Sequence, residues 1–207
     1  MLRSLTLTAA VLVLLTSSAV AQERGTTLGG VPFGASPAEV AAAMEKLALQ
    51  RAVLKDEATS FPADQTFAGR IDGRQVLVVA MYDGSDALEK MLVTFVTTDA
   101  ECLPFYRDFK IALTREYGDT HADVEKWKAP FDNGRHAGRE VTAIRSGKGF
   151  VGATWNRDDL DGTAGMSLSV AGNLTVTLAY ESSKWPVEVE RRRKLMKATT
   201  SGGALQE

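Results

Sequence analysis

The sequence has few of the residues on which most catalytic and metal sites depend. Its 207 residues include one cysteine, Cys102, and two histidines, His121 and His136. A single cysteine cannot form an intramolecular disulfide, so the hydrophobic core must stabilise the fold. The catalytic patterns G-x-S-x-G, S-x-x-K and H-E-x-x-H are all absent. We therefore predict no catalytic residues and no cofactor, and we expect a protein without enzymatic activity.

The sequence also lacks an excess of positive charge. Its formal net charge is −2, whereas binding to nucleic acid requires a concentrated positive field. The one basic cluster spans residues 191–194, in a segment with helical character, where such runs are typical of a solvated helix face. We expect no nucleic-acid partner. Steering of this segment to anionic lipid is a third alternative, which its thin apolar face disfavours.

Long hydrophobic runs are missing apart from one at the N-terminus. A short basic start containing Arg3 precedes an apolar run over residues 5–15, and the small residues 19–21 follow. This pattern predicts a signal peptide over residues 1–21, cleaved near Ala21. The run is too short to span a membrane comfortably. No cysteine stands directly after the cleavage site, where a lipoprotein would carry its lipid anchor. We expect a periplasmic or secreted protein that does not associate with a membrane.

One helix is well specified near the mature N-terminus. Ser36 can cap the helix, Pro37 suits its first position, and Glu39 can complete a capping box with Ser36. The apolar residues that then recur on one face are Val40, Met44 and Leu47. The spacing predicts a helix that packs on a sheet.

A second helix is predicted from an aromatic and aliphatic stripe. Its members are Cys102, Phe105, Tyr106, Phe109, Leu113 and Tyr117. Their spacing predicts a helix that starts near residues 101–103 and ends before Gly118. In this setting Cys102 is interpreted as a small buried hydrophobe, with a nucleophilic thiol as the alternative.

The rest of the chain favours antiparallel strands. The expected strands are residues 51–54, 65–71, 74–82, 88–97, 123–128, 139–145, 149–156, 166–170 and 174–180. Residues 56–64, 130–138 and 157–163 are expected as loops or polar turns. A basic helix is expected at 187–197, and a disordered tail at 198–207.

The order of these elements predicts an α+β fold, with an antiparallel sheet and two helices packed on one face. Each helix is followed by hairpins, so a tandem arrangement with halves 28–98 and 99–181 is an alternative description of a single domain at 22–197. The sequence does not decide between one sheet and two.

His121, Asp123 and Glu125 are the candidate metal ligands. In an extended strand they point to the same face, and histidine with carboxylates can bind a divalent ion. A polar segment after a helix end is the competing interpretation. Residues 158–162 are similar to a calcium loop, but in the register set by Gly162 the first acidic ligand is replaced by Arg157 and the last by Leu168.

Two segments together resemble a family of small bacterial envelope proteins. Residues 33–40 (FGASPAEV) are similar to the helix entry of the SmpA/OmlA-like proteins, which share a β-lactamase-inhibitor-protein-like fold. Tyr117 and Gly118 followed by Trp127 resemble the helix end and tryptophan-bearing strand of that family. The resemblance implies helices packed on one face of an antiparallel sheet, and it implies no functional residue.

We therefore expect an exported, non-enzymatic protein that binds another envelope protein or a small ligand. The alternative is a metal-dependent or thiol-dependent enzyme, or a small-ligand binder. In that case His121, Asp123 and Glu125, or Cys102, would carry the chemistry.

Overall fold

The computed structural model describes residues 27–53, 61–159 and 162–202. The predicted signal peptide, most of the loop predicted at 56–64 and the last residues of the tail lie outside these ranges. The described elements are η1 (Leu28–Gly30), α2 (Pro37–Lys46), β1 (Gln50–Ala52), β2 (Gln65–Ile71), β3 (Arg74–Tyr82), β4 (Leu88–Phe95), α3 (Cys102–Tyr117), β5 (Ala122–Trp127), α4 (Glu140–Arg145), β6 (Gly149–Asp159), β7 (Gly162–Val170), β8 (Val176–Glu181) and α5 (Trp185–Gly202).

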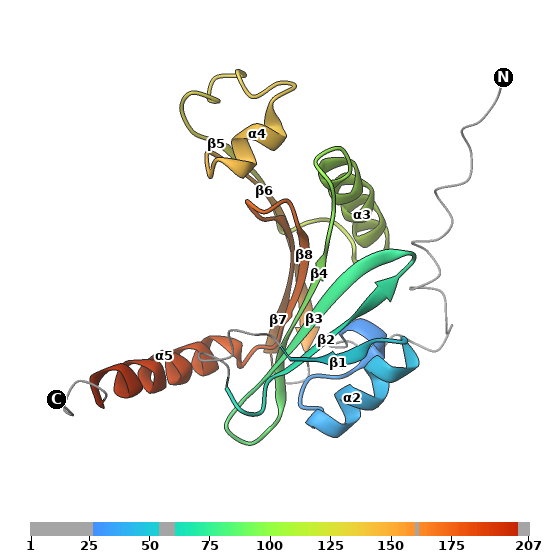
Figure 1. Cartoon of the computed structure of the whole chain (residues 1–207), viewed down its shortest axis with the longest axis vertical. Helices are drawn as coiled ribbons and strands as arrows, with labels where there is room; N and C mark the ends of the chain where they lie inside the picture. The colour runs from blue at the N-terminus through green and yellow to red at the C-terminus, as the bar shows by residue number, and fades with distance from the viewer. Residues whose placement is uncertain (1–26, 54–60, 160–161, 203–207) are drawn as a thin grey trace.

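All eight strands form one antiparallel sheet (Figure 1), in the order β1-β2-β3-β4-β8-β7-β6-β5. The two groups of hairpins meet where β4 pairs with β8, from Lys90 opposite Glu181 to Phe95 opposite Val176. The predicted α+β class with an antiparallel sheet is confirmed. The open question of one sheet or two is answered in favour of one.

Helix α2 begins as its sequence predicts. The Ser36 hydroxyl accepts a hydrogen bond from the Glu39 amide at 3.4 Å, and the Glu39 carboxylate accepts one from the Ser36 amide at 2.8 Å. The Ser36 amide and the Ser36 hydroxyl both donate to the Glu39 carboxylate, and these two bonds hold the pKa of Glu39 below its ordinary value. On the other side of the helix, Val40 and Met44 are fully buried, so this end of the core is anchored by a locally encoded helix.

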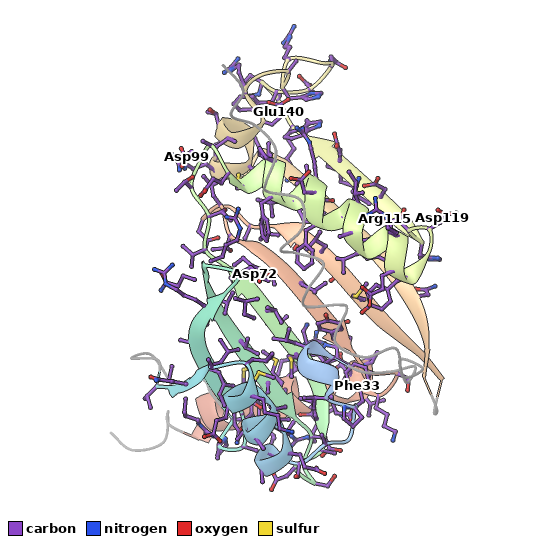
Figure 2. The ribbon with its side chains drawn as sticks, turned by 90° about the vertical axis from the view of Figure 1, so that its right-hand side faces the viewer. Phe33, Asp72, Asp99, Arg115, Asp119 and Glu140 are labelled. Carbon is purple, nitrogen blue, oxygen red and sulfur yellow. The ribbon has the colours of Figure 1, made fainter. Side chains whose placement is uncertain are left out.

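Helices α2 and α3 cover the same face of the sheet (Figure 2). The aromatic stripe of α3 packs onto the end of β4, where Phe95 makes edge-on contacts with Phe105 and Phe109 at 5.2 and 5.5 Å between ring centroids. Gly118 ends the helix with a φ of 86°, a conformation that glycine adopts at little cost. The predicted second helix is therefore confirmed at both ends.

The strand expected at residues 139–145 is wrong. Residues Glu140–Arg145 form the short helix α4, and β6 pairs with β5 and β7 instead. The β-branched residues of this segment favour a strand by propensity. The helix nevertheless forms because it buries Ala143 and Ile144 together, where α4 packs against β6.

Several element boundaries also differ from prediction, and the two largest differences concern a turn and a helix. Most of the polar turn expected at 157–163 is sheet, since β6 continues to Asp159 and β7 begins at Gly162, with Asp158 paired to Thr163. The C-terminal helix starts at Trp185 and runs to Gly202, beyond the expected end at Lys197. Continuous pairing to a neighbouring strand outweighs the polar composition of the predicted turn.

The cap of α2 can be tested by substitution. We expect Ser36→Ala to lower the free energy of unfolding by about 1 kcal/mol, because the hydroxyl satisfies an otherwise unpaired amide of the first turn. Chemical denaturation measures the change. Glu45→Ala, at an exposed position of the same helix, is the control and should change it by less than about 0.5 kcal/mol. Equal effects of the two substitutions would contradict the role of the cap.

Candidate functional site: the uncovered sheet face and the α5 junction

The sheet face opposite α2 and α3 carries side chains that alternate with those of the core. We call it the uncovered face because no helix of the described ranges packs along it, and we define it by three rows of paired residues that cross the middle of the sheet. Its apolar part lies on β3 and β4 and consists of Leu77, Val79, Met81 and Leu92, all half-buried. Aliphatic side chains in this number are typical of a sheet face that another layer covers.

The neighbouring strands contribute hydroxyl groups to the same rows. These residues are Thr94, Thr154, Ser167, Ser169 and Thr177, all half-buried. The hydroxyls of Thr94 and Thr177 lie 3.2 Å apart across the β4–β8 pair. Gly152, Gly165, Ala179 and the exposed Asn156 are the uncharged residues that complete the rows on these strands, so most of the surface of this part is formed by short side chains.

The uncovered face is close to neutral. Among the described side chains of the three rows, the charged ones are Lys90 and Glu181. They lie opposite each other in the β4–β8 pair and form an ion pair at 2.5 Å. The Lys90 ammonium also lies 4.8 Å from the Trp185 ring centroid at the start of α5. A binding partner would meet apolar and hydroxyl groups rather than an excess of one charge.

Helix α5 leaves the sheet beside this face. Figure 1 shows it extending from the end of the sheet on the side away from α2 and α3, and in Figure 2 it lies behind the sheet while those helices lie in front. Residues 193–198 are exposed. The helix therefore stands beside the uncovered face rather than packing along it.

A buried ion-pair network fixes the start of α5, and we call it the α5 junction. Arg192 donates two hydrogen bonds to the Asp64 carboxylate, at 2.6 and 2.8 Å, one to Glu188 at 2.7 Å and one to the Tyr82 carbonyl at 2.5 Å. Its guanidinium also lies 4.2 Å from the Phe61 ring centroid. One side chain thus joins α5 to the end of β3 and to the segment before β2.

The surrounding charges are neutralised within the junction. Burial alone would raise the pKa of Glu188, but hydrogen bonds from Arg191 and Arg192 outweigh it and hold that pKa below its ordinary value. Arg193 pairs with Glu190 on the exposed side of the helix. The basic cluster at 191–194 was predicted to be a solvated face, which Arg193 and Lys194 fit. Arg192 is instead buried, and it holds the helix in place.

Glu89 adds a buried carboxylate at the same end of the sheet. A register shift in the β3–β4 pair leaves Glu89 without a residue opposite it on β3. The residue is only 3 % exposed. Burial raises its pKa, and a hydrogen bond from the Ser182 hydroxyl opposes that rise. The Glu89 carbonyl also accepts the Ser182 amide at 2.9 Å. This contact fixes the chain between β8 and α5.

The predicted metal ligands do not converge on a metal site. Asp123 and Glu125 share the helix-covered face of β5, as predicted, but Asp123 pairs with Lys110 of α3 at 2.7 Å. His121 precedes the strand, and its amide bonds to the Thr154 carbonyl at 2.8 Å. Within the described ranges, no group of three or more His, Cys, Asp or Glu side chains is arranged to hold a metal ion.

Cys102 lies at the start of α3 and is fully buried. Burial raises the pKa of its thiol, which disfavours the reactive thiolate. Its sulfur lies 3.8 Å from the Asp99 carbonyl oxygen. Of the two histidines, His136 stacks on Trp127 with ring centroids 4.6 Å apart. This environment fits the interpretation of Cys102 as a small core residue.

The role of Arg192 can be tested against its neighbour in the sequence. We expect Arg192→Leu to lower the free energy of unfolding by about 3–5 kcal/mol, because Asp64 would lose its guanidinium partner and the buried Glu188 would keep only Arg191. Arg193→Leu removes an exposed pair and should cost less than about 1 kcal/mol. Chemical denaturation, with hydrogen exchange of the α5 amides, measures both. Similar costs for the two variants would show that the network does not hold the helix.

None of the described helices is both long and apolar enough to cross a membrane. Comparison with protein-family models, with curated proteins and with solved structures finds no match. The resemblance to SmpA/OmlA-like proteins therefore stays a prediction from the sequence, and the site must be interpreted from its own geometry.

Proposed function

We propose that the chain is an exported, non-enzymatic binding protein that holds another envelope protein against its uncovered face. The observation that carries this proposal is the composition of that face. It presents four half-buried aliphatic side chains beside five half-buried hydroxyl groups. The predicted signal peptide at residues 1–21 supplies the expectation of export.

The extent of the face favours a polypeptide partner. Five strands about 4.8 Å apart, crossed by three rows about 6.8 Å apart, span roughly 24 by 20 Å. That projected area of about 480 Å² is more than half of the ~800 Å² that one partner contributes to a standard protein interface. Short side chains such as Ser167 and Ser169 would let the backbone of a partner approach the sheet closely.

The chemistry of the face suits a partner that is itself part apolar and part polar. Leu77, Val79 and Leu92 would gain free energy by leaving water, at about 25 cal/mol per Å² of apolar surface. The threonine and serine hydroxyls can each donate and accept hydrogen bonds, so they can satisfy polar groups of the partner. Because Lys90 and Glu181 neutralise each other, recognition would depend little on salt.

The alternative is an enzyme or small-ligand binder that uses a metal ion or the Cys102 thiol. Asp123 is already paired with Lys110 and Cys102 is buried, and neither observation favours this alternative. Stoichiometric zinc in the purified protein, or a Cys102 thiol that reacts as fast as a free thiol in solution, would support it.

The proposal predicts that a bulky charge on the uncovered face abolishes binding. Ser167 lies between Thr154 and Ala179 in the middle row, where a longer side chain can extend toward solvent without disturbing the core. We expect Ser167→Arg to reduce capture of the partner from a periplasmic extract at least about tenfold, equivalent to 1.4 kcal/mol. Chemical cross-linking followed by mass spectrometry measures the captured partner.

Glu45→Arg provides the matched control, since it places an arginine on the exposed side of α2, on the opposite face of the molecule. It should capture the same partner as the unmodified chain. Loss of capture in both variants, or in neither, would refute the proposed surface. Failure of the unmodified chain to capture any protein would refute it as well.

A further inference from the structure

Two buried polar groups between α3 and the sheet have no hydrogen-bond partner within the described chain. Both carboxylate oxygens of Glu116 are inaccessible to solvent and unpaired, and so is the indole nitrogen of Trp155. A buried polar atom without a partner typically costs about 1–3 kcal/mol, and a charged one costs more. Such groups call for an explanation, and a ligand is one of the available explanations.

The two groups lie at the same end of the covered face. Glu116 follows Leu113 by three residues, so it continues the buried stripe with which α3 faces the sheet. Trp155 is 1 % exposed and belongs to the core-facing side of β6. The chain leaving α3 joins β6 next to Trp155, where the His121 amide bonds to the Thr154 carbonyl. In Figure 2, Arg115 and Asp119 mark this end of α3, which lies over β6 and β7.

The site lies at the rim of the core. Glu116 is partly exposed although its carboxylate is not, and Gly118 and Asp119, two and three residues later, are exposed. A ligand that binds the carboxylate must displace the groups that cover it, and this position at the rim allows that without opening the sheet. This location is separate from the uncovered face, which lies on the other side of the sheet.

We propose that the end of α3 binds a guanidinium group, with Glu116 as its anion and Trp155 as a donor to an acceptor oxygen on the same ligand. A guanidinium matches a carboxylate through two parallel hydrogen bonds, and both oxygens of Glu116 are available for them. A bare metal ion fits less well, because the indole N–H is a donor that cannot coordinate it. A ligand with both a cationic fork and an acceptor, such as arginine, satisfies both groups.

Thermal unfolding with matched ligands tests this inference. L-arginine presents a guanidinium and a carboxylate, whereas L-citrulline has the same length and an uncharged urea. We expect L-arginine at several times its dissociation constant to raise the melting temperature by roughly 2–4 °C, and L-citrulline to leave it unchanged. The capped tripeptide Gly-Arg-Gly, compared with free arginine, distinguishes an arginine side chain of a peptide from a free amino acid as the source of the guanidinium.

Glu116→Gln tests the residue itself. It should remove the response to L-arginine, and without ligand it should melt at the same or a higher temperature, because it removes an unpaired buried charge. Asp119→Asn, an exposed carboxylate three residues away, should keep the full response. The inference is overturned if neither guanidinium compound stabilises the unmodified chain, or if Glu116→Gln responds equally. It is also overturned if Glu116→Gln is markedly less stable without ligand, since Glu116 would then have a partner within the chain.

Discussion

The fold depends on the pairing of β4 with β8. This pair joins a first group of strands, β1 to β4, to a second group, β5 to β8, along six residue pairs. It is also a contact between segments far apart in sequence, so its formation requires a large loop to close. Once it forms, Met91, Val93, Leu178 and Tyr180 belong to one continuous core, and α2 and α3 cover a single face. The uncovered face and its Thr94–Thr177 contact exist only because the two groups share this seam.

The α5 junction is built on the end of the same seam. Glu89 on β4 and Ser182 after β8 are bonded to each other, and Arg192 connects the helix that follows to Asp64 and Tyr82. A salt bridge with this burial adds little stability on balance, but it is costly to break because the remaining charges stay buried. The network therefore fixes the direction in which α5 leaves the sheet, beside the proposed binding surface.

Local signals in the sequence predicted the helices well, and they failed where distant contacts decide. The capping box of Ser36 and Glu39 and the stripe from Cys102 to Tyr117 are each complete within one segment, so the start of the first helix and both ends of the second could be predicted. The strand expected at 139–145 was wrong because its β-branched residues favour a strand, while burial of Ile144 against the core required a helix. Arg192 was placed on a solvated face because its main partner, Asp64, is 128 residues away. The spacing of Trp185, Glu188 and Arg192 on one helix face was the available signal. Glu116 and Trp155 gave no signal, since an unpaired polar group can be recognised only once its surroundings are known.

Among the elements that the structure describes, helices cover one face of the sheet and none packs along the other. The methionines test it directly, because Met81 is half-buried on the uncovered face while Met44, Met91 and Met166 are almost fully buried in the core. Met196 on α5 is 47 % exposed and serves as the internal reference for rapid oxidation. Brief treatment of the purified folded protein with hydrogen peroxide, followed by mass spectrometry of its peptides, should oxidise Met196 first, Met81 next, and the three core methionines only after unfolding. Protection of Met81 equal to that of Met91 would show that both faces are covered and would contradict the account.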